Sequence, residues 1–304
     1  MSVSGVMKQG RVTPWLYVLP CLLVIGLFIL YPVVNTIALS LRDRSGSEPA
    51  SVQCTSDRAC WGILENYRYA LTAPEMTTAL RNNALWLVLM VPATVGTGLA
   101  AAVLADRVRY ETLVKSIIFM PMAISFIGAG LIWRFVYDLQ AGSGRQIGLL
   151  NAALDGVGLD PVPWLSTPGL TNLALMVVGL WLWAGFCMTI LSAALKALPT
   201  EVLEAARVDG ATQWQLFRRV MVPMILPTIT VVTTTLVIIV LKIFDIVFVM
   251  TNGNFATEVI ANRMFNLIVT HVGRSTAIAV LLLLLTVPVM IFNVRRFREQ
   301  EEMR

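Results

Sequence analysis

Charged residues inside apolar segments are the first candidates for polar chemistry in this sequence. Lys242 and Asp245 fall within the apolar segment 228–250, three positions apart, a spacing that places both side chains on one face of a helix. Charges inside a membrane span cost free energy and usually face a cavity or a partner. The sequence therefore predicts one of two arrangements: a structural ion pair near the membrane surface, or a polar wall that hydrogen-bonds a ligand.

Aromatic residues in the apolar segment 172–195 form a second group of candidates. Trp181, Trp183 and Phe186 lie close to Gly179 along the chain. Aromatic rings can stack on the flat faces of sugars, but in membrane spans they more often pack against other helices or anchor the span at the interface. Composition and spacing leave both interpretations open.

Several kinds of chemistry are excluded by what the sequence lacks. No glycine directly precedes a lysine, so the G-x-x-x-x-G-K-[ST] phosphate-binding loop is absent. His271 is the only histidine, which excludes a histidine-rich metal site, and no nucleophile–base pair is visible. We therefore expect no catalysis, no metal and no bound cofactor in this chain.

The composition is that of an integral membrane protein. Hydrophobic residues make up 57% of the 304 residues and charged residues 13%, against about 25% charged residues in soluble domains, and the mean hydropathy is +0.75. Six apolar segments are long enough to cross a bilayer as helices: 15–41, 84–105, 116–136, 172–195, 228–250 and 275–294. These segments are too long for barrel strands, so we expect an all-α domain over 14–294, with a polar tail at 1–13 and a basic tail at 295–304.

Six spans place both termini on the same side of the membrane, and the charge distribution indicates which side. Lysine and arginine are more numerous on the side of the termini and crowd next to the span ends, where they set the orientation. We therefore expect both termini in the cytoplasm. The polar segment 42–81 then faces outward, and its Cys54 and Cys60 are candidates for a disulfide in an oxidising compartment.

The polar segment 198–227 carries strong helix-end signals. Thr200 can cap a short helix whose first turn is acidic, as a helix N-terminus favours. Gly210 should break that helix with a positive φ angle. Thr212 then opens a second helix, and Gln215 three residues later completes a capping-box pattern. Two short helices joined at a glycine would form a compact knob suited to docking into another protein.

This segment resembles the EAA loop of ABC-importer permeases. The matching positions are Glu204-Ala205-Ala206, Gly210, and Val220-Met221-Val222-Pro223; the longer stretch EAARVDGA, followed by Phe217 and Pro227, is similar to the carbohydrate-importer subfamily. The resemblance implies a type I importer permease fold with six spans. It also implies a coupling helix within 199–222 that sits in a cleft of a separate ATP-binding subunit. The residues expected to couple to that ATPase are Glu204, Ala205, Ala206, Asp209 and Gly210.

The same resemblance implies the partners and the location of the chain. Such a permease pairs with a second, homologous permease and with two subunits that bind ATP and Mg. An extracytoplasmic sugar-binding protein meets the outward-facing loops. The expected location is the bacterial inner membrane, as a multi-pass protein surrounded by lipid, and no nucleic acid is expected as a partner.

The resemblance also suggests where a substrate binds. In the maltose-type permeases that the chain resembles, the spans before and after the EAA loop line the sugar pocket. The expected substrate-binding residues on the first of these spans are Gly179, Leu182, Trp183 and Phe186. On the second span, Lys242 and Asp245 are added as the charged pair described above, and the family register places Leu236, Val240 and either Ile243 or Lys242 at facing positions.

The stretch IFDIVFVMTNGNFATEVIANRMF is most similar to α-glucoside permeases, so the expected substrate is a di- or oligosaccharide such as maltose or trehalose. One alternative is an ABC permease for another solute, such as glycerol phosphate or a polyamine; a phosphorylated solute would need several cations in the pocket, and only Lys242 is evident. A second alternative is an ion-coupled secondary carrier, which would show paired repeats and buried titratable residues. A membrane enzyme is a third, but it would need a catalytic constellation that the sequence lacks.

Overall fold

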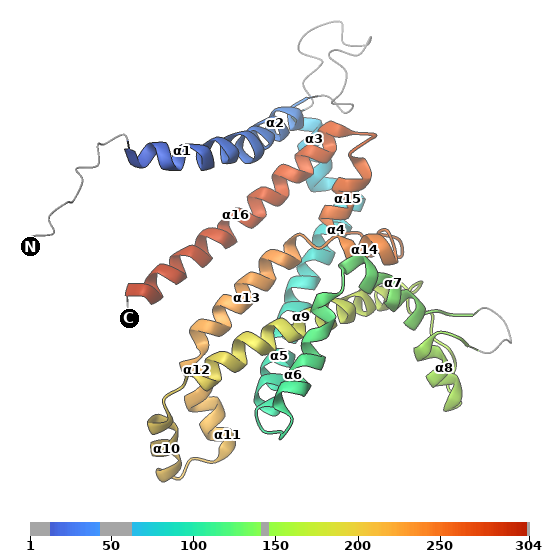
Figure 1. Ribbon diagram of the computed structural model, residues 1–304. Coiled ribbons are helices and arrows are strands. Elements are labelled where there is room, and N and C mark those ends of the chain that lie inside the picture. The colour runs from blue at the N-terminus through green and yellow to red at the C-terminus, as the bar shows by residue number, and fades with distance from the viewer. Residues whose placement is uncertain (1–12, 43–62, 141–145, 303–304) are drawn as a thin grey trace, which may run out of the picture.

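The computed structural model describes residues 13–42, 63–140 and 146–302, and this part of the chain is helical almost throughout, without a β-strand (Figure 1). Its α-helices are α1 (Thr13–Ile25), α2 (Tyr31–Ser40), α3 (Ile63–Thr72), α4 (Pro74–Leu85), α5 (Val91–Ala105), α6 (Glu111–Phe119), α7 (Phe126–Val136), α8 (Leu149–Gly156), α9 (Leu170–Lys196), α10 (Thr200–Val208), α11 (Gln213–Leu216), α12 (Val222–Met224), α13 (Leu226–Leu241), α14 (Asp245–Met250), α15 (Ile260–Leu267) and α16 (Val272–Glu302). Between them lie three π-helical turns, η1 (Gly26–Leu30), η2 (Trp86–Met90) and η4 (Phe217–Met221), and one 3₁₀ turn, η3 (Met120–Ala123).

The membrane spans follow the order that the apolar segments predict. Four helical stretches are long and apolar enough to cross a membrane: Tyr17–Ser40, Pro74–Ala105, Leu170–Lys196 and Val272–Asn293. Two further spans result if each of two bent pairs counts as one: Glu111–Ala123 with Phe126–Val136, and Gln213–Met224 with Leu226–Leu241. The all-α membrane fold is thereby confirmed.

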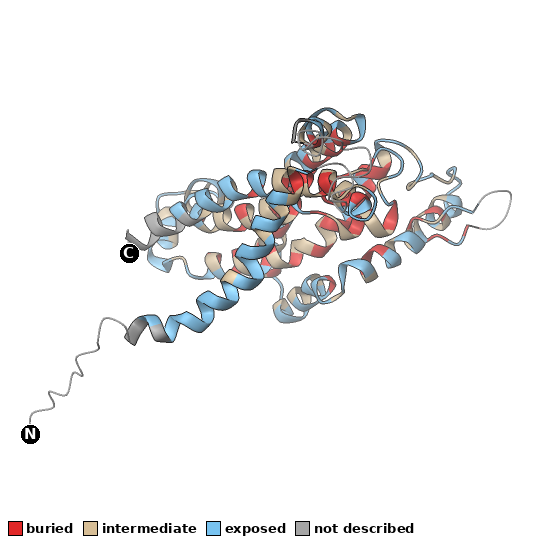
Figure 2. Cartoon of the chain, turned by 90° about the horizontal axis from the view of Figure 1, so that it is seen from above, coloured by how far each residue is buried: buried red, intermediate tan, exposed pale blue. Residues whose placement is uncertain are grey.

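The N-terminal part of the first span stands apart from the rest of the fold, whereas its last helix, α2, packs against α16. The helices α1, η1 and α2 form one rod that diverges from the other helices toward its N-terminal end (Figure 1), and nearly all of its described residues are exposed (Figure 2). Its exposed residues are apolar on all sides, including Leu27 and Phe28. A helix of this kind is stable only in lipid or against another membrane helix.

The second span begins earlier than the prediction of residue 84. Its helix starts at Pro74, because Ala73 has an extended backbone and a proline is favourable in a first helical turn. The polar pair Asn82 and Asn83 concealed this start, since two amides are unexpected inside a membrane helix. Both side chains are buried and hydrogen-bonded in the folded protein.

The third span is bent, so segment 116–136 does not form one continuous helix. The two halves, α6 with η3 and then α7, meet at 102°. Pro121 cannot donate a backbone hydrogen bond and lies in the 3₁₀ turn, after which Ile124 is extended. Ser125 then caps α7, with its Oγ accepting a hydrogen bond from the Gly128 backbone N–H at 3.1 Å.

The prediction of one helix over 228–250 is wrong. The helix α13 ends at Leu241, and α14 begins only at Asp245. At its other end, α13 makes a 68° bend with the helical segment that ends at Met224. The helix of the sixth span, α16, is longer than predicted. It continues to Glu302, through most of the segment 295–304 that was expected to be a tail.

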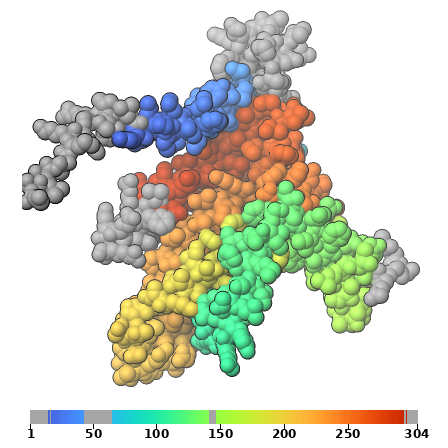
Figure 3. Space-filling view, viewed as in Figure 1, coloured from blue at the N-terminus to red at the C-terminus, as the bar shows by residue number. Residues whose placement is uncertain are grey.

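The helix α9 lies at the centre of the core and contacts α5, α6, α7 and α13 (Figure 1). Its fully buried side chains Leu175, Met188 and Leu191 pack with Trp86 and Leu236 from the neighbouring helices. One end of the molecule consists of α10 and α11, which form a lobe that projects beyond the body (Figure 3), and the opposite end is formed by α3, α14 and α15. The helices α9 and α13 thus run through the core between the lobe and the opposite end of the molecule.

Candidate coupling and substrate sites

The lobe of α10 and α11 has the two-helix form predicted from its end signals. Gly210 separates the helices with a φ of +81°, in the left-handed region that favours glycine. The capping box is confirmed: the Thr212 backbone N–H donates to Gln215 Oε1 at 2.8 Å, and the Gln215 N–H donates to Thr212 Oγ1 at 3.3 Å. The prediction that Thr200 caps α10 is wrong. The capping position is Pro199, whose backbone is extended, and Thr200 is the first helical residue.

The residues predicted to couple to an ATPase lie on the surface of this lobe. Glu204, Ala205, Asp209 and Gly210 are exposed, and Ala206 is half-buried. Two large apolar side chains nearby are also exposed to solvent, Val208 at 87% and Trp214 at 66%. Exposed apolar side chains on an otherwise polar projection are typical of a protein-docking surface.

The lobe is not packed against the body of the protein along its whole length. A cavity of about 400 Å³ separates it from the ends of α5 and α9, lined by Val103, Asp106, Arg107, Leu195, Leu203, Arg207, Gln213, Leu216, Phe217 and Met221. Leu195 and Leu216 are the buried side chains among these, at 6% and 2% exposure. The lobe therefore rests on a narrow apolar support next to the start of α13.

Two of the predicted substrate residues on α9 face the protein core. Gly179 lies against the second span, where a Cβ atom would come within 2.9 Å of Met90 Cε and 3.2 Å of the Trp86 ring. Leu182 is 1% exposed and belongs to the same core. Their role in this conformation is therefore close helix packing, for which a glycine is well suited.

The other two α9 residues belong to an aromatic group that is only partly covered. Trp183 stacks on Phe126 of α7, with ring centroids 5.9 Å apart and planes at 25°. Phe186 meets Trp183 edge to face at 5.7 Å. All three rings keep part of their surface exposed, which is the property that ring stacking on a ligand requires.

Lys242 and Asp245 do not lie on one helical face, because the break in the fifth span falls between them. No hydrogen bond or ion pair joins these two side chains. Asp245 is half-buried in the first turn of α14, where a carboxylate is favourable. Lys242 is exposed at the mouth of an apolar cleft of about 390 Å³ between α15 and α16, lined also by Phe244, Ala261, Met264, Phe265, Ala279, Leu282, Leu283 and Thr286.

The predicted substrate residues thus occupy three places, and Lys242 is the one of them that lines the cleft between α15 and α16. Gly179 and Leu182 lie in the core, Trp183 and Phe186 lie in the aromatic group, and the charged residues lie at the break. Leu236 and Val240 are fully buried, and Ile243 is 8% exposed. The predicted Cys54–Cys60 pair lies outside the described residues.

A buried network of amides links the second span, the fourth span and the loop after α14, and sequence reasoning missed it. Trp86 Nε1 donates to Asn172 Oδ1 at 2.8 Å, and Asn172 Nδ2 donates to Asn82 Oδ1 at 3.0 Å. Asn82 in turn donates to the carbonyl oxygens of Ala256 and Glu258, at 2.7 and 2.8 Å. The sequence did contain a signal for this network, namely polar residues at the ends of apolar segments. An amide that is buried there must find hydrogen-bond partners.

The loop between α14 and α15 has an unusual backbone that this network supports. Asn252, Gly253, Phe255 and Ala256 all have positive φ angles. Glu258 is half-buried beneath the loop and accepts a hydrogen bond from Asn262 Nδ2 at 2.7 Å. Burial raises the pKa of the Glu258 carboxyl above its usual 4.5.

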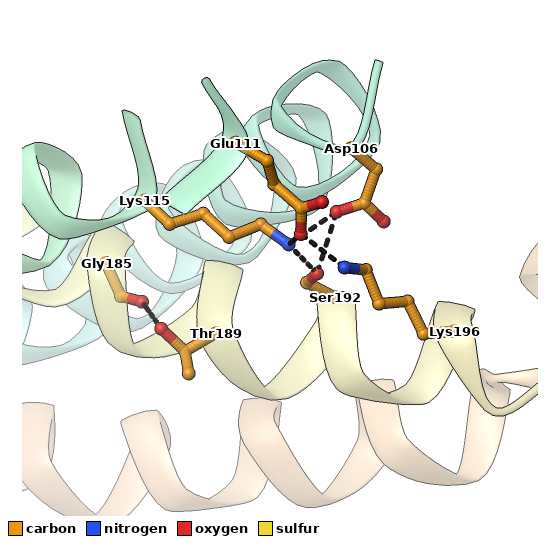
Figure 4. Close-up of polar contacts among 7 residues, drawn as sticks. All are labelled: Asp106, Glu111, Lys115, Gly185, Thr189, Ser192 and Lys196. Atoms are coloured by element: carbon orange, nitrogen blue, oxygen red, sulfur yellow. Dashed lines mark hydrogen bonds and ion pairs between the residues drawn. The ribbon is translucent and has the colours of Figure 1, made fainter. Parts of the chain in front are cut away.

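A second polar cluster joins α6 to α9 near the coupling lobe, and it too was missed (Figure 4). Lys115 bonds to Asp106, Glu111 and Ser192, and Lys196 bonds to Glu111. The signal in the sequence was a lysine at the edge of an apolar segment with acidic residues four and nine positions before it. Its partner Ser192 is 77 positions away along the chain, which spacing alone does not indicate.

A multi-span helical domain with a two-helix lobe projecting between its fourth and fifth spans defines a permease of the ABC-importer class. Residues 94–296 match the family of binding-protein-dependent transport system inner membrane components, and the chain belongs to this family. It is thus a multi-pass inner-membrane transport component and not an enzyme.

Comparison with known proteins identifies similar permeases. The chain is 50% identical to the osmoprotective compounds uptake permease protein GgtC of Synechocystis sp., over 95% of this chain and 100% of that protein. It is 44% identical to the alpha-glucoside transport system permease protein AglF of Rhizobium meliloti, over 94% of this chain and 82% of that one. Among solved structures, a chain of a bacterial alginate ABC transporter, crystallised in complex with an alginate pentasaccharide-bound periplasmic protein, superposes with a TM-score of 0.74. That match covers 92% of both chains at 21% identity, and it supports the fold alone.

Proposed function

We propose that this chain forms half of the translocation path of an ATP-driven importer for an α-glucoside, a di- or oligosaccharide such as maltose or trehalose. The observation that carries this proposal is the 44% identity to an alpha-glucoside permease over almost the whole chain. The partly exposed rings of Trp183, Phe186 and Phe126 supply the stacking surface that a neutral sugar requires.

In this proposal ATP and Mg bind to separate subunits, and the chain itself hydrolyses nothing. The lobe of α10 and α11 docks into a cleft of an ATPase subunit on the cytoplasmic side, where both termini also lie. Its exposed Ala205 and Gly210 allow close approach of the ATPase backbone. A second permease, a second ATPase subunit and an extracytoplasmic binding protein complete the transporter.

The transport step in this proposal follows from the geometry of the lobe. Closure of the ATPase subunits around ATP moves the lobe, and the movement passes into α9 and α13, which flank it. These two helices also carry most of the predicted substrate residues. A sugar-facing surface that is covered in one state is then uncovered in the other, which is the requirement for alternating access.

A second candidate function is the import of osmoprotective solutes. The 50% identity to an osmoprotective compounds uptake permease covers the whole of that protein and favours this candidate. The two candidates share fold and coupling and differ only in the solute. Lys242 forms no ion pair with a carboxylate among the described residues.

Uptake by the complete transporter tests the proposal. The chain would be co-expressed with its second permease, ATPase subunits and binding protein in a host that lacks sugar and osmoprotectant importers. We expect ATP-dependent uptake of labelled maltose or trehalose that excess unlabelled α-glucoside abolishes. Glycerol phosphate and putrescine serve as controls and should not compete. Uptake of osmoprotective solutes without α-glucoside uptake would favour the second candidate, and no ATP-dependent uptake of any solute would contradict both.

A further inference from the structure

We propose that Lys115 is a positioning residue that fastens α6 to α9, so that one half of the broken third span moves with the helix that leads into the coupling lobe. This inference rests on the proposed ATP-driven function. It assigns a second route by which motion of the lobe reaches the far end of the molecule, besides the direct connection through α13.

Lys115 is the centre of a compact set of charged and polar contacts. Its ammonium group donates to Asp106 Oδ1, to Glu111 Oε1 at 2.6 Å, and to Ser192 Oγ (Figure 4). Ser192 Oγ also donates to Asp106 Oδ1 at 3.0 Å. The lysine side chain is only 20% exposed, so water screens these contacts little. The end of α5, the start of α6 and the last turns of α9 therefore meet at one ammonium group.

The contacts of α6 with α9 follow an antiparallel register over three levels. At the first level Gly185 is so close to α6 that a Cβ atom would lie 2.5 Å from the Ile118 carbonyl oxygen. At the second, Ser192 meets Lys115. At the third, Lys196 bonds to Glu111. As residue numbers rise on α9 they fall on α6, so the two helices lie side by side along the final three turns of α9.

The coupling lobe follows directly from this helix pair. Lys196 is the last residue of α9, and α10 begins at Thr200. A displacement of α10 therefore acts on the part of α9 to which α6 is bonded. Glu111, the first residue of α6, is bonded at this same end through Lys196.

After its bend, the third span contacts two helices: α9 of the fourth span and α14 of the fifth. After the 102° bend, Phe126 at the start of α7 stacks on Trp183. Further along α7, a Cβ atom on Gly130 would lie 3.2 Å from Val249 of α14. The route thus runs from α10 through the end of α9 to α6, and then through α7 to α14, the helix that follows the break in the fifth span.

The ionic contacts between α6 and α9 fix the register of the two helices, which apolar packing alone does not. The close approach at Gly185 would tolerate sliding and rotation, because dispersion contacts have little directionality. A lysine of α6 that bonds Ser192 of α9 and Asp106 at the end of α5 specifies one register. Without it, Asp106 and Glu111 would lose the cation between them, and their carboxylates would repel each other.

The test replaces the lysine in the complete transporter, reconstituted in proteoliposomes with its partner permease, ATPase subunits and binding protein. For Lys115→Met we expect normal membrane insertion and ATPase co-purification, with at least a fivefold loss of sugar transported per ATP hydrolysed. Lys115→Arg, which keeps the charge and several donors, should retain most of that ratio. Arg109→Met is the matched control, because Arg109 is exposed near the same helix end and makes no ion pair with any described residue.

A cross-link separates a positioning role from a merely structural one. In a background without the native cysteines, the pair Lys115→Cys and Ser192→Cys should show the same loss of coupling. Joining the two thiols with a short bifunctional reagent should restore the transport ratio, because α6 and α9 would again move together. If Lys115→Met did not assemble, Ser192→Ala, which removes one of the three partners, should show a two- to threefold loss.

A normal transport ratio in Lys115→Met, or a cross-link that lowers the ratio further, would overturn this inference. Either result leaves the proposed function intact as long as the unmodified transporter takes up sugar with ATP. Failure of the unmodified transporter would contradict the proposed function itself, so the two failures are distinguishable.

Discussion

Gly98 of α5 touches α9 directly: a Cβ atom built on Gly98 would lie 2.4 Å from the Cβ of Cys187 and 3.0 Å from the backbone nitrogen of Met188. Real side chains do not approach so closely, so only a glycine at this position allows the two helices their observed separation. Since α9 connects the core to the coupling lobe, the placement of the lobe depends on this contact.

Gly98→Ala should destabilise the protein by about 1–3 kcal/mol through overpacking, because both neighbours of the added methyl group belong to helix α9. Gly96→Ala is the control on the same helix. It has no atom within 4 Å of the added Cβ and should be neutral or stabilise the helix by up to about 1 kcal/mol. Thermal unfolding of the two variants in detergent measures the difference. Equal melting temperatures would contradict the close packing of α5 on α9.

A charge placed on the coupling lobe should separate insertion from coupling. Ala205 is exposed, and Ala205→Glu should leave the amount of protein in the membrane unchanged while ATPase subunits no longer co-purify and uptake is lost. Gly210→Pro should act in the same way, because proline cannot adopt the φ of +81° at this position.

The control for the lobe is Val157→Glu, which adds the same charge at a site that is 73% exposed and lies after α8, away from the lobe. This variant should keep ATPase co-purification. Normal uptake by Ala205→Glu and Gly210→Pro would show that the lobe does not couple the permease to its ATPase.

Trp183 of the aromatic group should contribute more to substrate uptake than Lys242 at the break in the fifth span. Trp183→Ala removes the ring that both Phe126 and Phe186 contact, and we expect the apparent KM for sugar to rise at least fivefold with ATPase assembly intact. Lys242→Ala should have a smaller effect, because Lys242 faces the cleft between α15 and α16. Leu173→Ala, at an exposed position on the same helix as Trp183, is the control. A sugar-bound structure with neither Trp183 nor Lys242 in contact would refute this assignment.

Glu258, in the loop between α14 and α15, should make the stability of the protein depend on pH. Its folded-state pKa is raised, chiefly by burial, so the folded protein binds this proton more tightly than the unfolded chain does. The stabilisation is therefore complete below the unfolded pKa and is lost as pH rises through the folded pKa. Glu258→Gln, which imitates the protonated form, should flatten this dependence when melting temperature is measured between about pH 4 and 8. An unchanged profile in the variant would show that the pKa of Glu258 is the same in the folded and unfolded states.

Much of the fold could be predicted from the sequence because it depends on local properties. The length of an apolar segment decides whether it enters a membrane, and this is why six spans follow from hydropathy. Helix ends depend on residues a few positions apart, so the Thr212–Gln215 capping box and the positive φ of Gly210 were predicted correctly. Family membership likewise follows from a local motif around Glu204.

Only the tertiary structure decided which faces of these helices meet. The backbone contact of Gly185 with Ile118, and the bonds of Lys115 to Ser192, join positions far apart in the sequence. The break in the fifth span also depends on such contacts, because Asn83 of the second span donates to the Leu241 carbonyl where α13 ends. Hydropathy reports how much apolar surface a segment carries, and not which neighbour covers it. That is the physical reason why Gly179 and Leu182, expected at a substrate surface, lie in the core.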